Sequence, residues 1–268
     1  MTFFTRLAKQ APHRGTAIAH VQLWHFVASV EQALTPTLRG VPFAVVSSLR
    51  HTGVVVDVNE LARALGVRPG TSVQRLRNRF SNVQLRLHHP ERMQGFIRAF
   101  RKQARTWGHL LSASTDGHAV TVLIPAVSGF ERAGVFLQIQ ADCWKELECN
   151  VMVGMGSSPA FALLAARTCA EPSYRYLDQN EHQALNTLPV SALPRIGRRT
   201  AHALVQLNVP TVYHFLKLAP ETIEHLGGRS LLRIYHQYVL TAQTLPLPAG
   251  LPVSTPFLGP RVLGLASA

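Results

Sequence analysis

The sequence predicts an α+β protein whose C-terminal part is a separate all-helical unit, and three observations predict it. The runs "FAVVSS" and "GVVVDV" are β-branched and bounded by Gly or Ser, which is typical of short strands. The apolar residues from Met93 to Trp107 fall at helical spacing, and the other side of that segment is basic. From about Leu185 onwards, short helical segments alternate with tight turns.

The elements of the first part follow from local patterns. Residues 16–24, "TAIAHVQLW", are mostly apolar and predict a central strand, and "ASVEQAL" predicts a short helix after it. A loop rich in Pro and Gly separates this helix from the two β-branched strands. The segment "NELARALGV" then predicts a helix that has Asn59 as its N-cap and Gly66 at its end.

The middle of the chain repeats this mixture. After the helix over 93–107, "HAVTVLIPAV" predicts a strand entered from the turn "STDGH", and "NVMVGMG" predicts another strand. The segment "PAFALLAARTCA" predicts a helix that ends before Pro172. After Ala242 the sequence is rich in Pro and Gly, and we expect a loosely held tail.

Composition points to a polyanionic partner. The 27 Lys and Arg exceed the 14 Asp and Glu, which gives a formal net charge of +13 and a pI near 10.8. Such a surplus attracts nucleic acid, although a basic surface without a partner has the same composition. The 3 Cys have no metal-ligand spacing and are expected to be reduced thiols. With no signal peptide and no membrane-spanning run in the sequence, we expect a cytoplasmic location and no membrane contact.

Two basic segments are candidate nucleic-acid contacts. Eleven Lys and Arg lie between Leu61 and Thr115 against one acid, Glu91; a solvated helix face is the alternative explanation.

The sharper signal is "LPRIGRRTAHAL", residues 193–204, which has the form of a helix–hairpin–helix motif. A glycine in the hairpin lets a phosphate approach the N–H groups that begin the second helix. The predicted contacts are Arg195, Gly197, Arg198, Arg199 and Thr200. Such contacts grip the DNA backbone without reading its sequence, and an ordinary helical turn containing Gly is the alternative.

Six segments in the same order resemble the Y-family (DinB/UmuC-type) translesion DNA polymerases. They are "VQLWHFVASVE", "PTLRGVPFAVV", "GVVVDVNELARALGV", "STDG", "LLAARTCAEP" and "LPRIGRRTAHAL". The resemblance covers about residues 17–242. It implies a palm with a ferredoxin-like βαββαβ sheet and helices on one face, small fingers, and a helix–hairpin–helix thumb.

The resemblance also implies domain boundaries. The palm is expected at 17–28 and 84–178, the fingers at 29–83, the thumb at 179–242, and a Pro/Gly-rich tail at 243–268. About 26 residues follow the expected thumb, so we expect the little-finger domain of the family to be absent.

The resemblance places a degenerate site on the palm. Nucleotidyl transfer by two Mg²⁺ ions needs a carboxylate cluster, and the three family carboxylates become Gln22, Asp116 and Gly117 here. Asp116 is then the only candidate metal ligand at these positions. We expect Trp24, beside this site, to be a core residue. The resemblance places Val27 at the family's steric gate. It places Glu60 and Arg63 at the Tyr and Arg of the fingers helix, and Glu171 at the Lys before the Pro, which are the positions that hold the triphosphate.

These residues predict a protein that is not an enzyme and has no cofactor. The resemblance to the ImuB-type branch implies an accessory factor that binds DNA non-specifically in the SOS response, DNA damage tolerance and induced mutagenesis. Its implied partners are a sliding clamp, a RecA-like accessory protein and an error-prone replicative-type polymerase. One alternative is an active error-prone polymerase that uses Mg²⁺ at a rearranged site of Asp57, Glu60 and Asp116. A second alternative is a protein-interaction scaffold that does not bind DNA.

Overall fold

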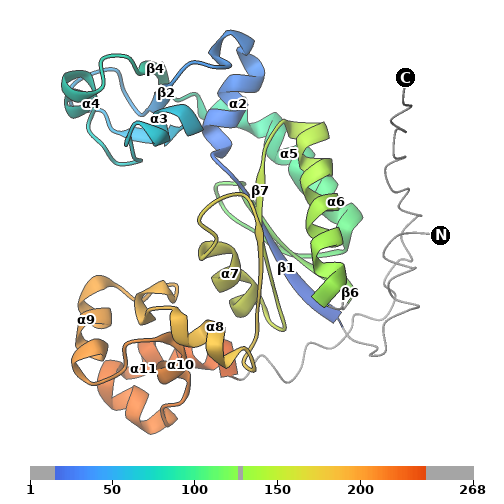
Figure 1. Ribbon diagram of the computed structural model, residues 1–268, viewed down its shortest axis with the longest axis vertical. Coiled ribbons are helices and arrows are strands. Elements are labelled where there is room, and N and C mark those ends of the chain that lie inside the picture. The colour runs from blue at the N-terminus through green and yellow to red at the C-terminus, as the bar shows by residue number, and fades with distance from the viewer. Residues whose placement is uncertain (1–15, 126–128, 240–268) are drawn as a thin grey trace, which may run out of the picture.

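The computed structural model describes residues 16–125 and 129–239, which form three parts (Figure 1). A five-stranded sheet with its helices lies in the middle, a three-stranded sheet with short helices lies at one end, and a group of short helices lies at the other. The predicted mixed α+β fold is confirmed. Within these residues, every helix is too short or too polar to cross a bilayer.

The five-stranded sheet has the order β5-β6-β1-β7-β8. Its strands are β1 (Thr16–Leu23), β5 (His109–Ala113), β6 (Ala119–Pro125), β7 (Val151–Gly156) and β8 (Tyr174–Leu177). β1 pairs antiparallel with both β6 and β7, and β8 extends the sheet parallel to β7. Two long helices, α5 (Pro90–Trp107) and α6 (Gly129–Leu147), complete the chain order β1-α5-β5-β6-α6-β7. This is the ferredoxin-like βαββαβ arrangement that the resemblance implies.

The alternation of β1 decides which residues face the core. Ala19, Val21 and Leu23 are buried beneath α5 and α6. Because successive side chains of a strand point to opposite faces, Gln22 lies on the other face. Trp107 is buried at the end of α5, and its Nε1 donates a hydrogen bond of 2.8 Å to Asp142 on α6. The long helices therefore cover one face of the sheet, and Gln22 lies on the opposite face.

The prediction of helices on one face only is wrong. Helix α7 (Pro159–Arg167) packs against the face opposite to α5 and α6, where it contacts β1, β7 and β8 (Figure 1). Gly154 of β7 allows this close packing, since a Cβ at that position would lie 2.0 Å from the carbonyl oxygen of Ala162. The sheet is thus covered on both faces at the α7 end and only on one face near Gln22.

The smaller sheet has the order β3-β2-β4, with β2 (Phe43–Val46), β3 (Val55–Val58) and β4 (Gln84–Leu87). Its helices are α3 (Glu60–Ala64) and α4 (Val73–Arg79). Asn59 caps α3 as predicted, because its side chain accepts a hydrogen bond from the Ala62 N–H. Strand β4 pairs with β2 in this sheet, although the expected palm range begins at residue 84. Helix α2 (Phe26–Leu34) and the short turn Pro36–Leu38 join the two sheets.

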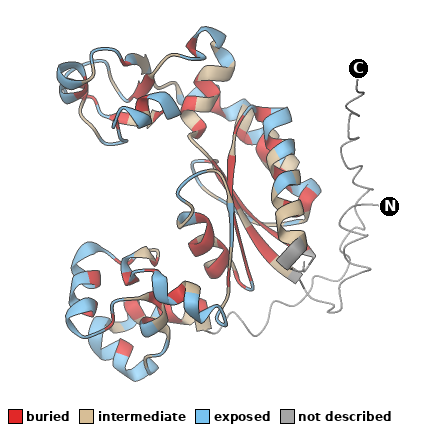
Figure 2. Ribbon diagram, in the orientation of Figure 1, coloured by how far each residue is buried: buried red, intermediate tan, exposed pale blue. Residues whose placement is uncertain are grey.

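The last described part is helical. It contains α8 (His182–Thr187), the turn Val190–Ala192, α9 (Arg198–Gln206), α10 (Val212–Leu216) and α11 (Pro220–Val239). Helix α11 is kinked at Gly227 and Gly228. These elements surround their own buried core (Figure 2). Helix α7 contributes Phe161 to this core, and the centre of its ring lies 5.2 Å from that of Tyr238. The predicted tail at 243–268 lies outside the described residues. The domain boundaries remain predictions.

Candidate functional site

Two of the segments that the sequence predicts for the site meet at the C-terminal end of β1. Gln22 pairs with Ala119 of β6, and the N–H of Leu23 donates to the carbonyl oxygen of His118 at 2.8 Å. The turn that carries Asp116 and Gly117 therefore lies beside Gln22, as the resemblance implies. Gln22 precedes Asp116 by 94 residues in the sequence. The antiparallel pairing of β1 with β6 brings Gln22 and the turn together.

Asp116 is an exposed carboxylate at this turn. Its side chain is 61% exposed and forms an ion pair of 2.7 Å with Nδ1 of His118. Partial burial acts to raise the pKa of Asp116, but the hydrogen bond from Ser114 and the neighbouring His118 outweigh it and lower the pKa below its usual value. Asp116 is therefore ionised at neutral pH, and it already has a partner within the chain.

Gly117 has a conformational role. Its φ of +79° lies in the left-handed region that glycine adopts without strain. A Cβ at this position would lie 2.6 Å from side-chain atoms of Ile97 on α5. The turn therefore favours glycine, and the position carries no carboxylate.

The residues here do not fit a two-ion carboxylate cluster. Of the three positions, only Asp116 is acidic, and no group of three or more His, Cys, Asp or Glu among residues 16–125 and 129–239 is placed to hold a metal ion. The rearranged set of Asp57, Glu60 and Asp116 is likewise not brought together. Both oxygens of Asp57 accept hydrogen bonds within the chain, from His25 and Val58 on one side and from Ala28 on the other.

Arg63 stacks on Trp24 near the end of β1. The guanidinium carbon of Arg63 lies 4.8 Å from the centre of the Trp24 ring, which is a cation–π distance. Trp24 is half-buried, so the prediction that it is a core residue is wrong. Its ring also meets His25 edge-on at 4.5 Å. Val27 is half-buried and packs against the core, whereas Glu171 is exposed in the bend after α7.

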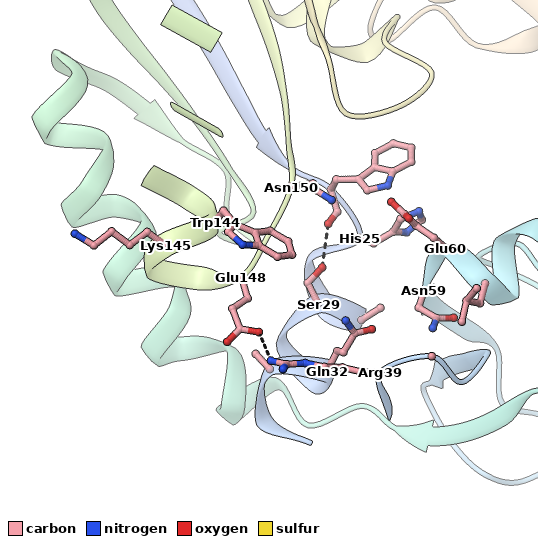
Figure 3. A pocket seen from close by; sticks show the side chains of 15 residues that line it. His25, Ser29, Gln32, Arg39, Asn59, Glu60, Trp144, Lys145, Glu148 and Asn150 are labelled. Atoms are coloured by element: carbon pink, nitrogen blue, oxygen red, sulfur yellow. Dashed lines mark hydrogen bonds and ion pairs between the residues drawn. The ribbon is translucent and has the colours of Figure 1, made fainter. Parts of the chain in front are cut away.

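A cleft of about 900 Å³ opens between α2, α3 and the end of α6 (Figure 3). Ser29 of α2 lies in the middle of it, with Trp144 on one side and Glu60 on the other. Arg39 and Glu148 form an ion pair of 2.6 Å at its rim, where both side chains are about half exposed. Sequence analysis did not single out His25, Trp144 and Asn150 as lining residues, although His25 lies within the segment "VQLWHFVASVE".

The segment predicted as a helix–hairpin–helix motif, residues 193–204, presents an open, basic surface. Gly197 is the N-cap of α9 and offers no side-chain cap, and a Cβ there would meet nothing within 4 Å. Arg195, at φ +69°, precedes it in the hairpin. Arg198, Arg199 and Thr200 form the exposed first turn of α9. Their N–H groups and side chains are therefore accessible from solvent, and contact of these residues with DNA stays a prediction.

The basic segment between residues 63 and 105 is not one surface. Arg75, Arg77 and Arg79 lie on α4 of the smaller sheet, whereas the other large group lies on α5 (Figure 1). On α5, Arg98, Lys102 and Arg105 are exposed on a helix that covers the face away from Gln22. The two groups therefore lie on two different helices and do not form one continuous helix face.

Comparisons with known proteins agree on one family. The model of the impB/mucB/samB family matches residues 21–167. The DNA polymerase IV of Dehalococcoides mccartyi is 25% identical over 84% of this chain and 57% of its own length, and that of Saccharolobus solfataricus is 22% identical over 80% and 62%. This chain thus spans less than two thirds of those relatives.

Solved structures show the same fold. The insertion ternary complex of Dbh DNA polymerase matches with a TM-score of 0.71 at 18% identity, over 86% of this chain and 69% of that one. The post-insertion binary complex of Dbh DNA polymerase matches with a TM-score of 0.74 at 19% identity, over 86% and 68%. The prediction of a protein that is not an enzyme is wrong, because relatives and structural neighbours are named DNA polymerases and point to an enzyme.

Proposed function

Because this chain belongs to the impB/mucB/samB family, we propose that it holds primer–template DNA and functions in translesion DNA synthesis as a DNA polymerase. The family match carries this proposal. It covers residues 21–167, which contain the central sheet, the smaller sheet and the turn of Asp116. The matched solved structures extend the likeness to most of the chain.

The arrangement of the three parts supports DNA binding. The smaller sheet and the helical part project to the same side of the central sheet, which is the side of α7 (Figure 1). At the helical end, the first turn of α9 offers free backbone N–H groups together with Arg198 and Arg199. A helix N-terminus flanked by arginines suits a backbone phosphate. The net charge of +13 adds long-range attraction to any such duplex.

Polymerase activity is favoured over the accessory role by the names of the relatives. The set of carboxylates in this chain would differ from the family pattern, since Gln22 and Gly117 are not acidic. The ImuB-like branch, and partnership with a sliding clamp, a RecA-like protein or a replicative-type polymerase, stay predictions.

Primer extension tests the proposal. The purified chain is incubated with a primer–template, the four deoxynucleotides and either Mg²⁺ or Mn²⁺, on undamaged and abasic templates. We expect template-directed extension that Asp116→Asn lowers, with Glu224→Gln at an exposed position of α11 as a control that leaves it unchanged. Extension that is absent with both ions, at protein concentrations where the duplex is bound, would contradict polymerase activity. Failure to bind the duplex at all would contradict the whole proposal.

A further inference from the structure

The two most exposed large apolar side chains of the described residues lie on one helix. Leu137 of α6 is 63% exposed, and Trp144 of the same helix is 54% exposed. They are seven residues apart with exposed Ala141 between them, so the three share one face of α6. The row ends at the cleft beside α2, which Trp144 lines. Large apolar side chains on protein surfaces are usually scattered singly, so this row indicates a contact surface.

The neighbouring helix presents a row of cations. Arg98, Lys102 and Arg105 of α5 are exposed, and spacings of four and three residues place them on one face of the helix. Across residues 16–125 and 129–239, none of these three side chains forms an ion pair. Like charges four residues apart destabilise a helix, so α5 gains no stability from having Arg98 next to Lys102. The positive charge of this row is therefore available to a partner.

The two rows belong to one side of the molecule. Helices α5 and α6 pack side by side on the face of the central sheet away from α7 (Figure 1). The hydrogen bond from Nε1 of Trp107 on α5 to Asp142 on α6 joins them. Each helix buries its inner side in the same core, so the outer sides of both face solvent. The smaller sheet and the helical part project to the other side of the sheet, so DNA held between them would leave this side uncovered.

We propose that the outer sides of α5 and α6 dock an acidic amphipathic helix of another protein. Leu137 and Trp144 lie two helical turns apart, about 10 Å along the axis of α6, and this spacing fits apolar residues two turns apart on a partner helix. Asp and Glu beside the apolar residues of that helix pair with the cations of α5. A nucleic-acid backbone suits these cations but leaves Leu137 exposed, whereas a protein helix buries it. This inference stands apart from DNA binding and polymerase activity.

Charge argues against an occupant from this chain. Residues 1–15 and 240–268 contain no Asp or Glu, so neither segment supplies acids to the cations of α5. A second copy of the chain also has a net charge of +13, and like charges oppose its approach to a basic row. The occupant is therefore an acidic segment of a different protein.

A synthetic peptide is the probe, and fluorescence anisotropy is the measurement. The labelled peptide has about 18 residues, which is long enough to form a helix, with Leu along one face and Glu on the flank beside it. One control peptide has the same composition in scrambled order, so it lacks the apolar face. A second control has Gln in place of each Glu, so it lacks the charge. We expect the first peptide to bind more tightly than both controls, and its affinity to fall as salt rises.

Two double variants test the two rows. Leu137→Gln with Trp144→Gln removes the apolar row, and we expect about a tenfold loss of peptide affinity. The matched control is Val205→Gln with Leu207→Gln, which changes two exposed apolar side chains at α9 and should leave the affinity unchanged.

Arg98→Glu with Arg105→Glu reverses the charge of the basic row, and we expect about a tenfold loss here as well. The matched control is Arg75→Glu with Arg79→Glu, which makes the same charge change at exposed positions of α4 and should leave the affinity unchanged.

Circular dichroism checks that each variant is folded, and either double variant decides the outcome if the other does not fold. Equal binding of the scrambled peptide, or equal losses in a double variant and its matched control, would overturn the proposal. Displacement of the peptide by a short duplex would assign the surface to nucleic acid instead. A dimer in sedimentation that Leu137→Gln with Trp144→Gln dissociates would assign it to a second copy, and either result would also overturn the proposal.

Discussion

Reversing the charge of two arginines at the start of α9 should weaken DNA binding while it leaves the fold intact. Arg198 and Arg199 are exposed and follow the N-cap Gly197 directly. Each phosphate contact lowers log K by about 0.9 for every tenfold rise in salt. Losing two contacts should therefore reduce the salt slope by about 1.8 and lower the affinity roughly 60-fold at 0.1 M salt.

The same substitutions should not harm α9 itself. Acidic residues in the first turn of a helix interact favourably with its dipole, and basic residues interact unfavourably. Arg198→Glu with Arg199→Glu should thus raise thermal stability slightly while duplex affinity falls. A merely disrupted fold would lower both.

Fluorescence anisotropy with a labelled duplex, repeated over a salt series, measures the effect. The control is Arg98→Glu with Arg105→Glu on α5, which changes the net charge equally on a helix that covers the face away from Gln22. Equal losses in the two double variants would show that only total charge matters. An unchanged salt slope in the α9 variant would refute the assignment of phosphate contacts to this hairpin.

Three further predictions concern the central sheet. Gly154→Ala should destabilise the fold by more than about 3 kcal/mol, because its Cβ would meet the backbone of α7 at 2.0 Å; Gly95→Ala, with open space around it inside α5, should not, and urea unfolding compares them. Gly117→Ala should lower Tm more than Gly66→Ala: both positions have positive φ, but only the first puts a Cβ against Ile97, so equal changes in Tm would contradict the overlap. Burial, followed by the charge of His118, lowers the pKa of His20 to about 4 from the usual 6.5. Since the unfolded chain then binds the proton more readily, the stability from His20 is present above pH 6.5 and is lost as the pH falls towards 4, and His20→Gln should flatten that part of the stability profile.

Much of the architecture could be predicted because it depends on local patterns. The β-branched runs and the helical spacing from Met93 to Trp107 both gave elements that the structure contains. The βαββαβ order came from the family resemblance. The position of α7 could not be predicted in this way, because it depends on a contact between two elements. Gly154 of β7 has no side chain, and this lets α7 pack closely against the strand.

The candidate site was predicted less completely. Aligned motifs placed Gln22 beside the Asp116 turn, and the pairing of β1 with β6 agrees. The hydrogen bond from Ala28 of α2 to Asp57 of β3 joins a helix to a strand across 29 positions of sequence, so neither periodicity nor a local motif marks it. Along the sequence the basic residues between 63 and 105 form one cluster, but in the structure its two large groups lie on two different helices, α4 and α5. Charge counted along a chain does not show which side chains share a face.

Photo-crosslinking of a primer–template duplex tests most directly where DNA lies. The photoreactive residue p-benzoyl-phenylalanine replaces Thr200 on α9 in one variant and Thr106 on α5 in another, both exposed positions. The account predicts a strong crosslink from position 200 that rising salt weakens, and none from position 106. A crosslink from position 106, with none from position 200, would place the duplex on the α5 surface and contradict the account.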